Sequence, residues 1–209
     1  MRVALMAAGL ALAACAASGA SPPVASPPPH DIPLIVTDFD HEGANVGTRP
    51  TSHPLLGKPL PAFRLAREDG ESFSDVALKG RWTVIAFTGA WCGDSRADAP
   101  HLAALGSAID QDPDLDIVAV HVDARYGTFV SVSDFFAKSG IRIPAALDAD
   151  RDVYRALGVS WVPSYLVVDP QGVVRGFRTD LSHETASEGG VKRFIRDIAI
   201  LRGATTDRR

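Results

Sequence analysis

The run Trp82-Thr83-Val84-Ile85-Ala86-Phe87-Thr88 limits the possible folds of this chain more than any other segment does. It is apolar almost throughout and does not alternate with polar residues, which is typical of a strand buried on both faces of a sheet. Apolar residues then recur with a roughly helical period from Ala97 to Leu105. The run therefore predicts a layered α/β domain in which residues 82–88 form an interior strand.

Strand and helix patterns alternate along the rest of the chain. We expect strands at 116–122, 164–169 and 173–178, and helices at 131–139, 150–157 and 188–201. The turn Asp69-Gly70 predicts a hairpin from 62–66 and 72–73, and Pro170-Gln171-Gly172 predicts a second, later hairpin. This order predicts an α/β fold with a mixed sheet, parallel crossovers early, an antiparallel hairpin late and helices on both faces.

The first fourteen residues predict an export signal that ends at a lipid attachment site. Arg2 supplies the positive start, and residues 3–14 are apolar but too few to cross a bilayer as a helix, which takes ~20 residues. Leu12-Ala13-Ala14-Cys15 resembles the bacterial lipobox, in which the cysteine is lipidated; the alternative is an ordinary cleavage site. The predicted location is the cell envelope facing the periplasm. Ala16 favours the outer over the inner membrane, because some bacteria read an Asp there as an inner-membrane mark.

The composition of the chain predicts two parts, a tether and one domain. Residues 15–56 hold the lipid attachment and a Pro/Ser/Ala-rich tether, in which Ile32 to Val36 is a candidate edge strand. We expect residues 57–203 to form the domain and residues 204–209 to be a disordered tail. With 46% apolar and 22% charged residues the chain can bury one core, and its net charge of −4 without a basic stripe argues against a nucleic-acid partner.

Cys92 is the only thiol left if Cys15 carries a lipid. An exported protein with no second cysteine cannot form an internal structural disulfide, so Cys92 invites a functional explanation; the alternative is a small buried apolar residue. Cys92 follows a strand and precedes a helix, where unpaired N–H groups stabilise a thiolate. Arg96 would lower the pKa of this thiol, and Asp94 would raise it.

The segment from Phe87 to Pro100 resembles the active-site segment of the thioredoxin superfamily. Trp91, Cys92, Ser95 and Pro100 stand where that family places its tryptophan, nucleophile, resolving position and helix-kinking proline. The resemblance implies a thioredoxin-like sheet and makes Trp91, Cys92, Ser95 and Arg96 candidate catalytic residues.

A second signature follows in Gly158-Val159-Ser160-Trp161-Val162-Pro163-Ser164, which is similar to the sequence around the family's cis-proline. The resemblance implies that Pro163 faces Cys92. It also implies that the backbone of Val162 pairs with a substrate strand, which makes Val162 and Pro163 the predicted substrate groove. The alternative is a trans proline at the start of an edge strand.

The exported context, the early hairpin as an N-terminal extension and the insertion at 124–152 resemble the membrane-tethered thiol-disulfide reductases called TlpA-like or ResA-like, of the AhpC/TSA-redoxin type. The resemblance covers roughly residues 57–201. In that branch a carboxylate six residues after the nucleophile assists proton transfer, and Asp98 holds that position. A merely solvated helix-surface aspartate is the alternative.

Three positions depart from the family pattern. Ser95 replaces the second cysteine, which excludes the intramolecular disulfide of a dithiol cycle. Ala86 replaces the buried acid on the preceding strand, and Asp180 stands where a glycine usually lines the groove. We therefore expect monothiol exchange through Cys92, with Ser95 donating a hydrogen bond to the thiolate.

The predicted partners are exported protein disulfides or low-molecular-weight thiols, an external resolving thiol, and the membrane through the lipid. Two alternatives stay open: a redox-inactive binding module for an exported partner, and a thiol-dependent peroxidase. The second is disfavoured because Gly89 and Ile85 stand where a peroxiredoxin has threonine and proline.

No cofactor and no metal are expected. A copper site on this fold uses a second cysteine where Arg96 stands, and the histidines show no pairing at i, i+4. We expect all of them to be solvated: His30, His41, His53, His101, His121 and His183.

Overall fold

The computed structural model describes residues 35–36, 49–182 and 189–206. The predicted signal segment, Cys15 and most of the predicted tether lie outside these residues. The sheet contains β1 (Ile35–Val36), β4 (Trp82–Thr88), β5 (Leu115–Val122), β6 (Ala145–Asp148), β7 (Ser164–Val168) and β8 (Val174–Thr179). A separate hairpin is made by β2 (Arg64–Ala66) and β3 (Ser72–Ser74). The helices are α1 (Gly93–Ile109), α2 (Val132–Ser139), α3 (Asp152–Ala156) and α4 (Gly190–Thr206).

The sheet is mixed, as predicted. Its strand order is β1-β8-β7-β4-β5-β6, and β4 pairs parallel to β5 but antiparallel to β7. β7 and β8 form the late antiparallel pair, and β1 adds a parallel edge strand to β8. The early crossover through α1 and the late hairpin thus put β4 between two strands, and its residues are buried along its whole length.

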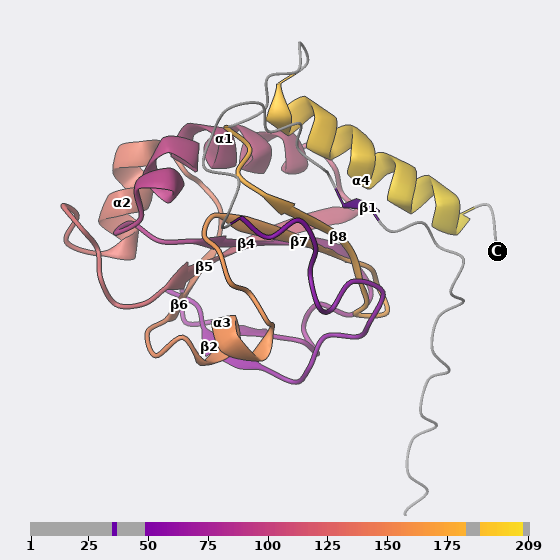
Figure 1. The fold of residues 1–209 in the computed structure, drawn as a ribbon, viewed down its shortest axis with the longest axis horizontal. Helices are drawn as coiled ribbons and strands as arrows, with labels where there is room; N and C mark the ends of the chain where they lie inside the picture. The colour runs from indigo at the N-terminus through magenta and orange to yellow at the C-terminus, as the bar shows by residue number, and fades with distance from the viewer. Residues whose placement is uncertain (1–34, 37–48, 183–188, 207–209) are drawn as a thin grey trace, which may run out of the picture.

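Helices cover both faces of the sheet (Figure 1). α1, α2 and α4 lie on one face, whereas α3 and the β2–β3 hairpin lie on the other. Alternate side chains of β4 enter the two cores: Val84 and Ala86 point into the first, and Ile85 and Phe87 into the second. This alternation explains why the strand reads as an unbroken apolar run.

The helix ends follow local signals. The Ser131 hydroxyl caps α2 by accepting a hydrogen bond from the Asp134 N–H at 3.0 Å, and Gly140 ends the helix with φ of 70°. α4 begins later than expected and continues to Thr206. Residues 204–206, which were expected in a disordered tail, therefore belong to a helix that packs against α1.

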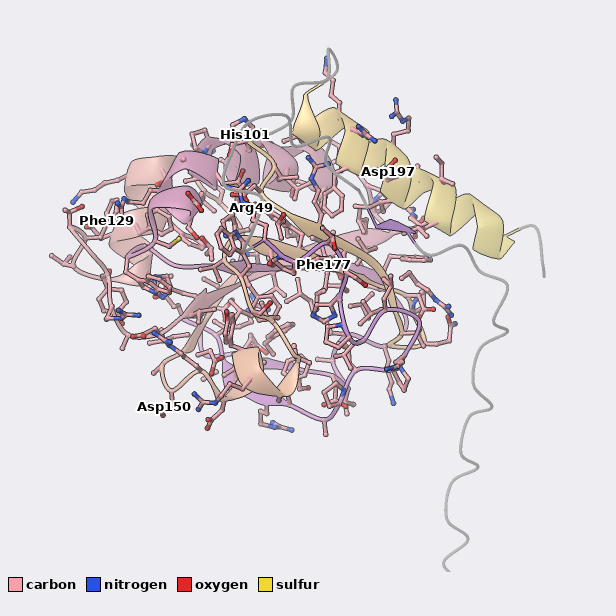
Figure 2. The ribbon with its side chains drawn as sticks, viewed as in Figure 1. Arg49, His101, Phe129, Asp150, Phe177 and Asp197 are labelled. Atoms are coloured by element: carbon pink, nitrogen blue, oxygen red, sulfur yellow. The ribbon has the colours of Figure 1, made fainter. Side chains whose placement is uncertain are left out.

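The packed part of the chain also begins earlier than the predicted boundary at 57. His53 is buried with its ring centroid 5.1 Å from that of Phe177, which is labelled in Figure 2, and burial lowers the pKa of His53 to about 4. Leu55 and Leu56 pack on the same core. The expectation that the histidines are solvated is therefore wrong for His53, because this segment covers the sheet instead of extending from it.

Candidate active site

Cys92 lies at the junction of β4 and α1 and is half-buried. It is the N-cap residue of α1: its carbonyl accepts the first helical hydrogen bond, from the Arg96 N–H at 3.1 Å. Its own N–H donates to the Gly89 carbonyl at 2.9 Å, which closes the turn before the helix. The sulfur thus lies beside the unpaired N–H groups of the first turn, which favour a negative charge.

The strand register brings Val162 and Pro163 to Cys92. β4 and β7 are antiparallel with Phe87 opposite Ser164, so the residues before Ser164 lie beside those after Phe87. The Val162–Pro163 peptide bond is cis, and the Cys92 Sγ–H donates to the Val162 carbonyl oxygen at 3.3 Å. The two motifs, far apart in sequence, therefore meet at one point.

Ser95 and Arg96 brace the turn that carries Cys92. Ser95 is buried, and its hydroxyl oxygen accepts from the Gly89 N–H at 3.2 Å. The exposed Arg96 side chain donates from Nη1 to the Ala90 carbonyl at 3.0 Å. Among the described residues, Ser95 makes no hydrogen bond to Cys92, in contrast to the expectation from sequence.

Asp98 is buried rather than solvated on the helix surface. Its Oδ2 accepts from the Tyr165 hydroxyl at 2.5 Å, and its Oδ1 accepts from the N–H groups of Leu181 and Ser182 at 2.7 Å each. Burial raises the pKa of Asp98, although these hydrogen bonds act in the opposite direction. All its described hydrogen bonds therefore run to β7 and to the residues after β8.

Comparisons with known proteins agree with this geometry. A family model described as the AhpC/TSA family matches residues 56–177. This chain belongs to the AhpC/TSA family. The match includes β4, α1 and β7, and thus both motifs that meet at Cys92.

Two proteins of similar sequence are named as thiol-disulfide enzymes. The chain is 30% identical over 118 residues to the thiol-disulfide oxidoreductase ResA of Bacillus subtilis (strain 168); this match covers 56% of this chain and 64% of ResA, less than two thirds of that protein. It is 25% identical over 149 residues to the thiol:disulfide interchange protein DsbE of Pseudomonas aeruginosa, covering 70% of this chain and 79% of DsbE.

Solved structures show the thioredoxin-like fold. A solution structure of a Bacteroides thetaiotaomicron protein matches with a TM-score of 0.57 at 21% identity, covering 70% of this chain and 90% of that one. The thioredoxin domain of a thiol-disulfide oxidoreductase from Bacteroides vulgatus matches with a TM-score of 0.54 at 20% identity, covering 68% and 96%.

Asp180 departs from the family pattern in a buried position close to the α1 N-terminus. Arg49, from the segment before the predicted domain, places Nε 3.2 Å from Asp180 Oδ2 and Nη2 3.7 Å from Asp94 Oδ2. The guanidinium carbon of Arg49, which is labelled in Figure 2, lies 5.4 Å from the ring centroid of Trp161. Burial outweighs the attraction of Arg49 and raises the pKa of Asp180 to about 7.

His121 is the residue beside the site that sequence analysis most clearly missed, and the expectation that it is solvated is wrong. It is buried at the end of β5, where its Nε2 accepts from the Ala90 N–H at 2.9 Å. Nδ1 then carries the proton and donates to the Asp123 carbonyl at 2.9 Å. Burial lowers the pKa of His121, which keeps this neutral form. The parallel pairing of β4 and β5 with Thr88 opposite His121 was the available signal.

Trp91 is half-buried beside Cys92. Its Nε1–H donates to the Val122 carbonyl at 2.7 Å, which attaches the ring to the end of β5. Trp91 and Cys92 both pack on the same apolar core.

The described residues contain no group of three or more His, Cys, Asp and Glu side chains that could hold a metal ion. In the same part of the chain, no helix is both long and apolar enough to span a membrane.

Proposed function

We propose that this protein is a thiol-disulfide oxidoreductase in which Cys92 is the nucleophile of a monothiol exchange. The observation that carries the proposal is the position of the Cys92 sulfur, at the first turn of α1 and 3.3 Å from the Val162 carbonyl oxygen. Cysteines that attack disulfides are commonly found at helix N-termini. The names of the relatives support the same reaction class.

The reaction would proceed in two exchanges. The Cys92 thiolate attacks one sulfur of a disulfide, so that a new S–S bond forms to Cys92 while the other sulfur leaves as a thiolate and takes up a proton from water. Because Ser95 cannot supply a second thiol, an external thiolate then attacks the mixed disulfide and releases Cys92. The pair of exchanges is balanced and needs no cofactor.

The surrounding residues would position these atoms. When Cys92 is deprotonated it no longer donates to the Val162 carbonyl, which becomes free to accept from the backbone of a bound substrate strand. Trp91 and Arg96 would hold the turn through Val122 and Ala90. Asp98 would act as a positioning residue for β7 and the segment after β8, through its three hydrogen bonds.

We also propose that the domain works outside the cytoplasm, facing the periplasm on a lipid carried by Cys15. Metabolic labelling with a fatty-acid analogue tests this proposal: we expect the label on the full chain and its loss in a Cys15→Ala variant. Equal labelling of both proteins would contradict lipidation at Cys15.

Turnover of a small mixed disulfide in the presence of excess external thiol tests the exchange reaction. We expect the wild-type chain to accelerate the exchange and the Cys92→Ser variant to lose the acceleration, while Ser107→Ala, on the exposed side of α1, keeps it. If the wild type and Cys92→Ser do not differ, the chain is not a Cys92 enzyme, and the binding module becomes the better explanation.

A further inference from the structure

Two arginines from different segments converge on Trp91, the residue before Cys92. Arg125 lies in the loop after β5, and Arg151 precedes α3. Their guanidinium carbons lie 4.6 Å and 5.7 Å from the Trp91 ring centroid, so both are within cation–π range. Neither residue belongs to a motif that the sequence analysis identified.

One carboxylate serves both arginines. Asp123 Oδ2 accepts from Arg125 Nε at 3.0 Å and from Arg151 Nε at 2.9 Å. The Asp123 side chain is 17% exposed, whereas those of Arg125 and Arg151 are 58% and 38% exposed. The cluster therefore has an excess positive charge, and its cationic groups face the solvent while its anion lies beneath them.

The outward face of the cluster has unused donors. Within the described part of the chain, the Nη groups of Arg125 make no hydrogen bond, because only its Nε binds Asp123. A planar guanidinium with free Nη groups matches the geometry of a carboxylate, which can accept two parallel hydrogen bonds from it.

The cluster is attached rigidly to the turn that carries Cys92. Asp123 and Arg151 are, among the described residues, the two non-glycine residues with positive φ, at 72° and 61°. Such conformations persist only where the surroundings impose them, and they concentrate at functional sites. His121 connects the Asp123 carbonyl to the Ala90 N–H, so the cluster and the turn before Cys92 share one buried side chain.

The loop after β5 also packs closely against the turn that carries Cys92. Gly127 has φ of 60°, and a Cβ there would lie 2.9 Å from the Ala90 carbonyl oxygen. Tyr154, in the middle of α3, packs on the same apolar core as Trp91 and Cys92. The arginines therefore contact the side chain of the residue directly before Cys92.

We propose that Arg125 and Arg151 bind a carboxylate of the disulfide substrate and thereby select mixed disulfides of carboxylate-bearing small thiols, with glutathione as the type. This inference rests on the proposed thiol-disulfide exchange and adds its substrate class. If the arginines only hold Asp123 and Trp91 in place, the charge of the substrate would not affect the rate.

The step that the cluster assists is the first exchange. The Cys92 thiolate attacks the glutathione sulfur of a glutathione–peptide disulfide, an S–S bond forms between Cys92 and glutathione, and the peptide thiolate leaves and is protonated by water. A second glutathione thiolate then releases Cys92 as oxidised glutathione forms. The arginines orient the glutathione half and take no part in the electron transfer.

A single-turnover experiment tests this selection without the external thiol. Excess reduced protein is mixed with a neutral fluorescent peptide joined by a disulfide either to glutathione or to glutathione diethyl ester, and release of the peptide thiol is followed. The two substrates differ in charge but not in the attacked bond. We expect the wild type to react about tenfold faster with the glutathione substrate, the size of one charge-assisted contact.

Variants of Arg125 test whether the arginine cluster causes this difference in rate. Arg125→Gln should bring the ratio of the two rates close to one, and Arg125→Lys should give an intermediate ratio because the charge remains without the fork. Arg81→Gln is the matched control: it removes a similarly exposed, ion-paired arginine next to the opposite end of β4 and should leave the ratio unchanged.

A wild-type ratio of one, or an unchanged ratio in Arg125→Gln, would overturn the inference while leaving the exchange reaction intact. A rate that increases only when carboxylates are placed on the peptide half would also overturn it, because the site would then recognise acidic peptides. No reaction with either substrate would instead reject the proposed function itself.

Discussion

Asp180 offers a quantitative test of the buried charges near the α1 N-terminus. Its side chain is 1% exposed, and its described charged neighbours are Arg49, which favours the carboxylate, and Asp98 and Asp94, which disfavour it. Desolvation is the largest effect and raises its pKa from 3.8 to about 7. Asp180→Asn replaces the carboxylate with a neutral group of nearly the same shape.

The sign follows from the two pKa values. Between about 4 and about 7, the folded wild type keeps a proton on Asp180 that the unfolded chain has lost, so its free energy of unfolding falls as the pH rises through this window. Within this window, each pH unit lowers the free energy of unfolding of the wild type by about 1.4 kcal/mol. From pH 5 to pH 8, the stability of Asp180→Asn relative to the wild type should therefore increase by about 3 kcal/mol.

Urea unfolding at pH 5, 6, 7 and 8, followed by circular dichroism, measures this difference. Comparing the two proteins cancels distant groups that titrate alike in both, such as His53, whose pKa is lowered to about 4. A stability difference that stays constant across this range would refute the reasoning, since it would mean that Asp180 is ionised in the folded protein at every pH tested.

Three further predictions concern residues in or next to the turn that carries Cys92. Ser95→Cys places a second thiol at the resolving position, and we expect it to release the substrate thiol from the mixed disulfide by forming a disulfide between Cys92 and the new thiol; in a single-turnover assay, a mixed disulfide that persists until external thiol is added would contradict this geometry. Asp98→Ala leaves the Leu181 and Ser182 N–H groups without their acceptor and should lower the free energy of unfolding by about 3 kcal/mol in urea titration, whereas a loss below about 1 kcal/mol would show that water replaces the carboxylate. Gly127→Ala should destabilise by more than about 1 kcal/mol, because its φ of 60° and the Ala90 carbonyl 2.9 Å from the new Cβ both oppose a side chain; a neutral effect in the same assay would mean that the loop moves away.

Much of the fold could be predicted because its signals are local. The apolar run of β4, the Ser131 cap and Gly140 end of α2, and the turn before β8 each depend on a few neighbouring residues. The domain limits were less accurate. Residues 49–56 carry no strong pattern of their own, and Leu55 and Leu56 belong to the folded part because a core built from distant segments of the chain receives them.

The residues of the candidate site likewise fall into those with a local sequence signal and those without one. Cys92, Pro163 and Val162 stand in short motifs, and their meeting follows once β4 and β7 are neighbours. His121 and Asp180 were misjudged or left unexplained, because burial of a polar residue depends on which elements cover it.

The sequence by itself determined the order of most strands and helices, though not β6, together with the candidate thiol and the absence of a resolving cysteine at position 95, since each of these is written in adjacent residues. Only the tertiary structure decided what surrounds that thiol. Arg125 and Arg151 reach Trp91 from separate segments, and Arg151 meets Asp123 across 28 positions of the chain. Contacts between segments so far apart depend on the pairing of β4, β5 and β6, which brings their carboxyl ends together at one edge of the sheet.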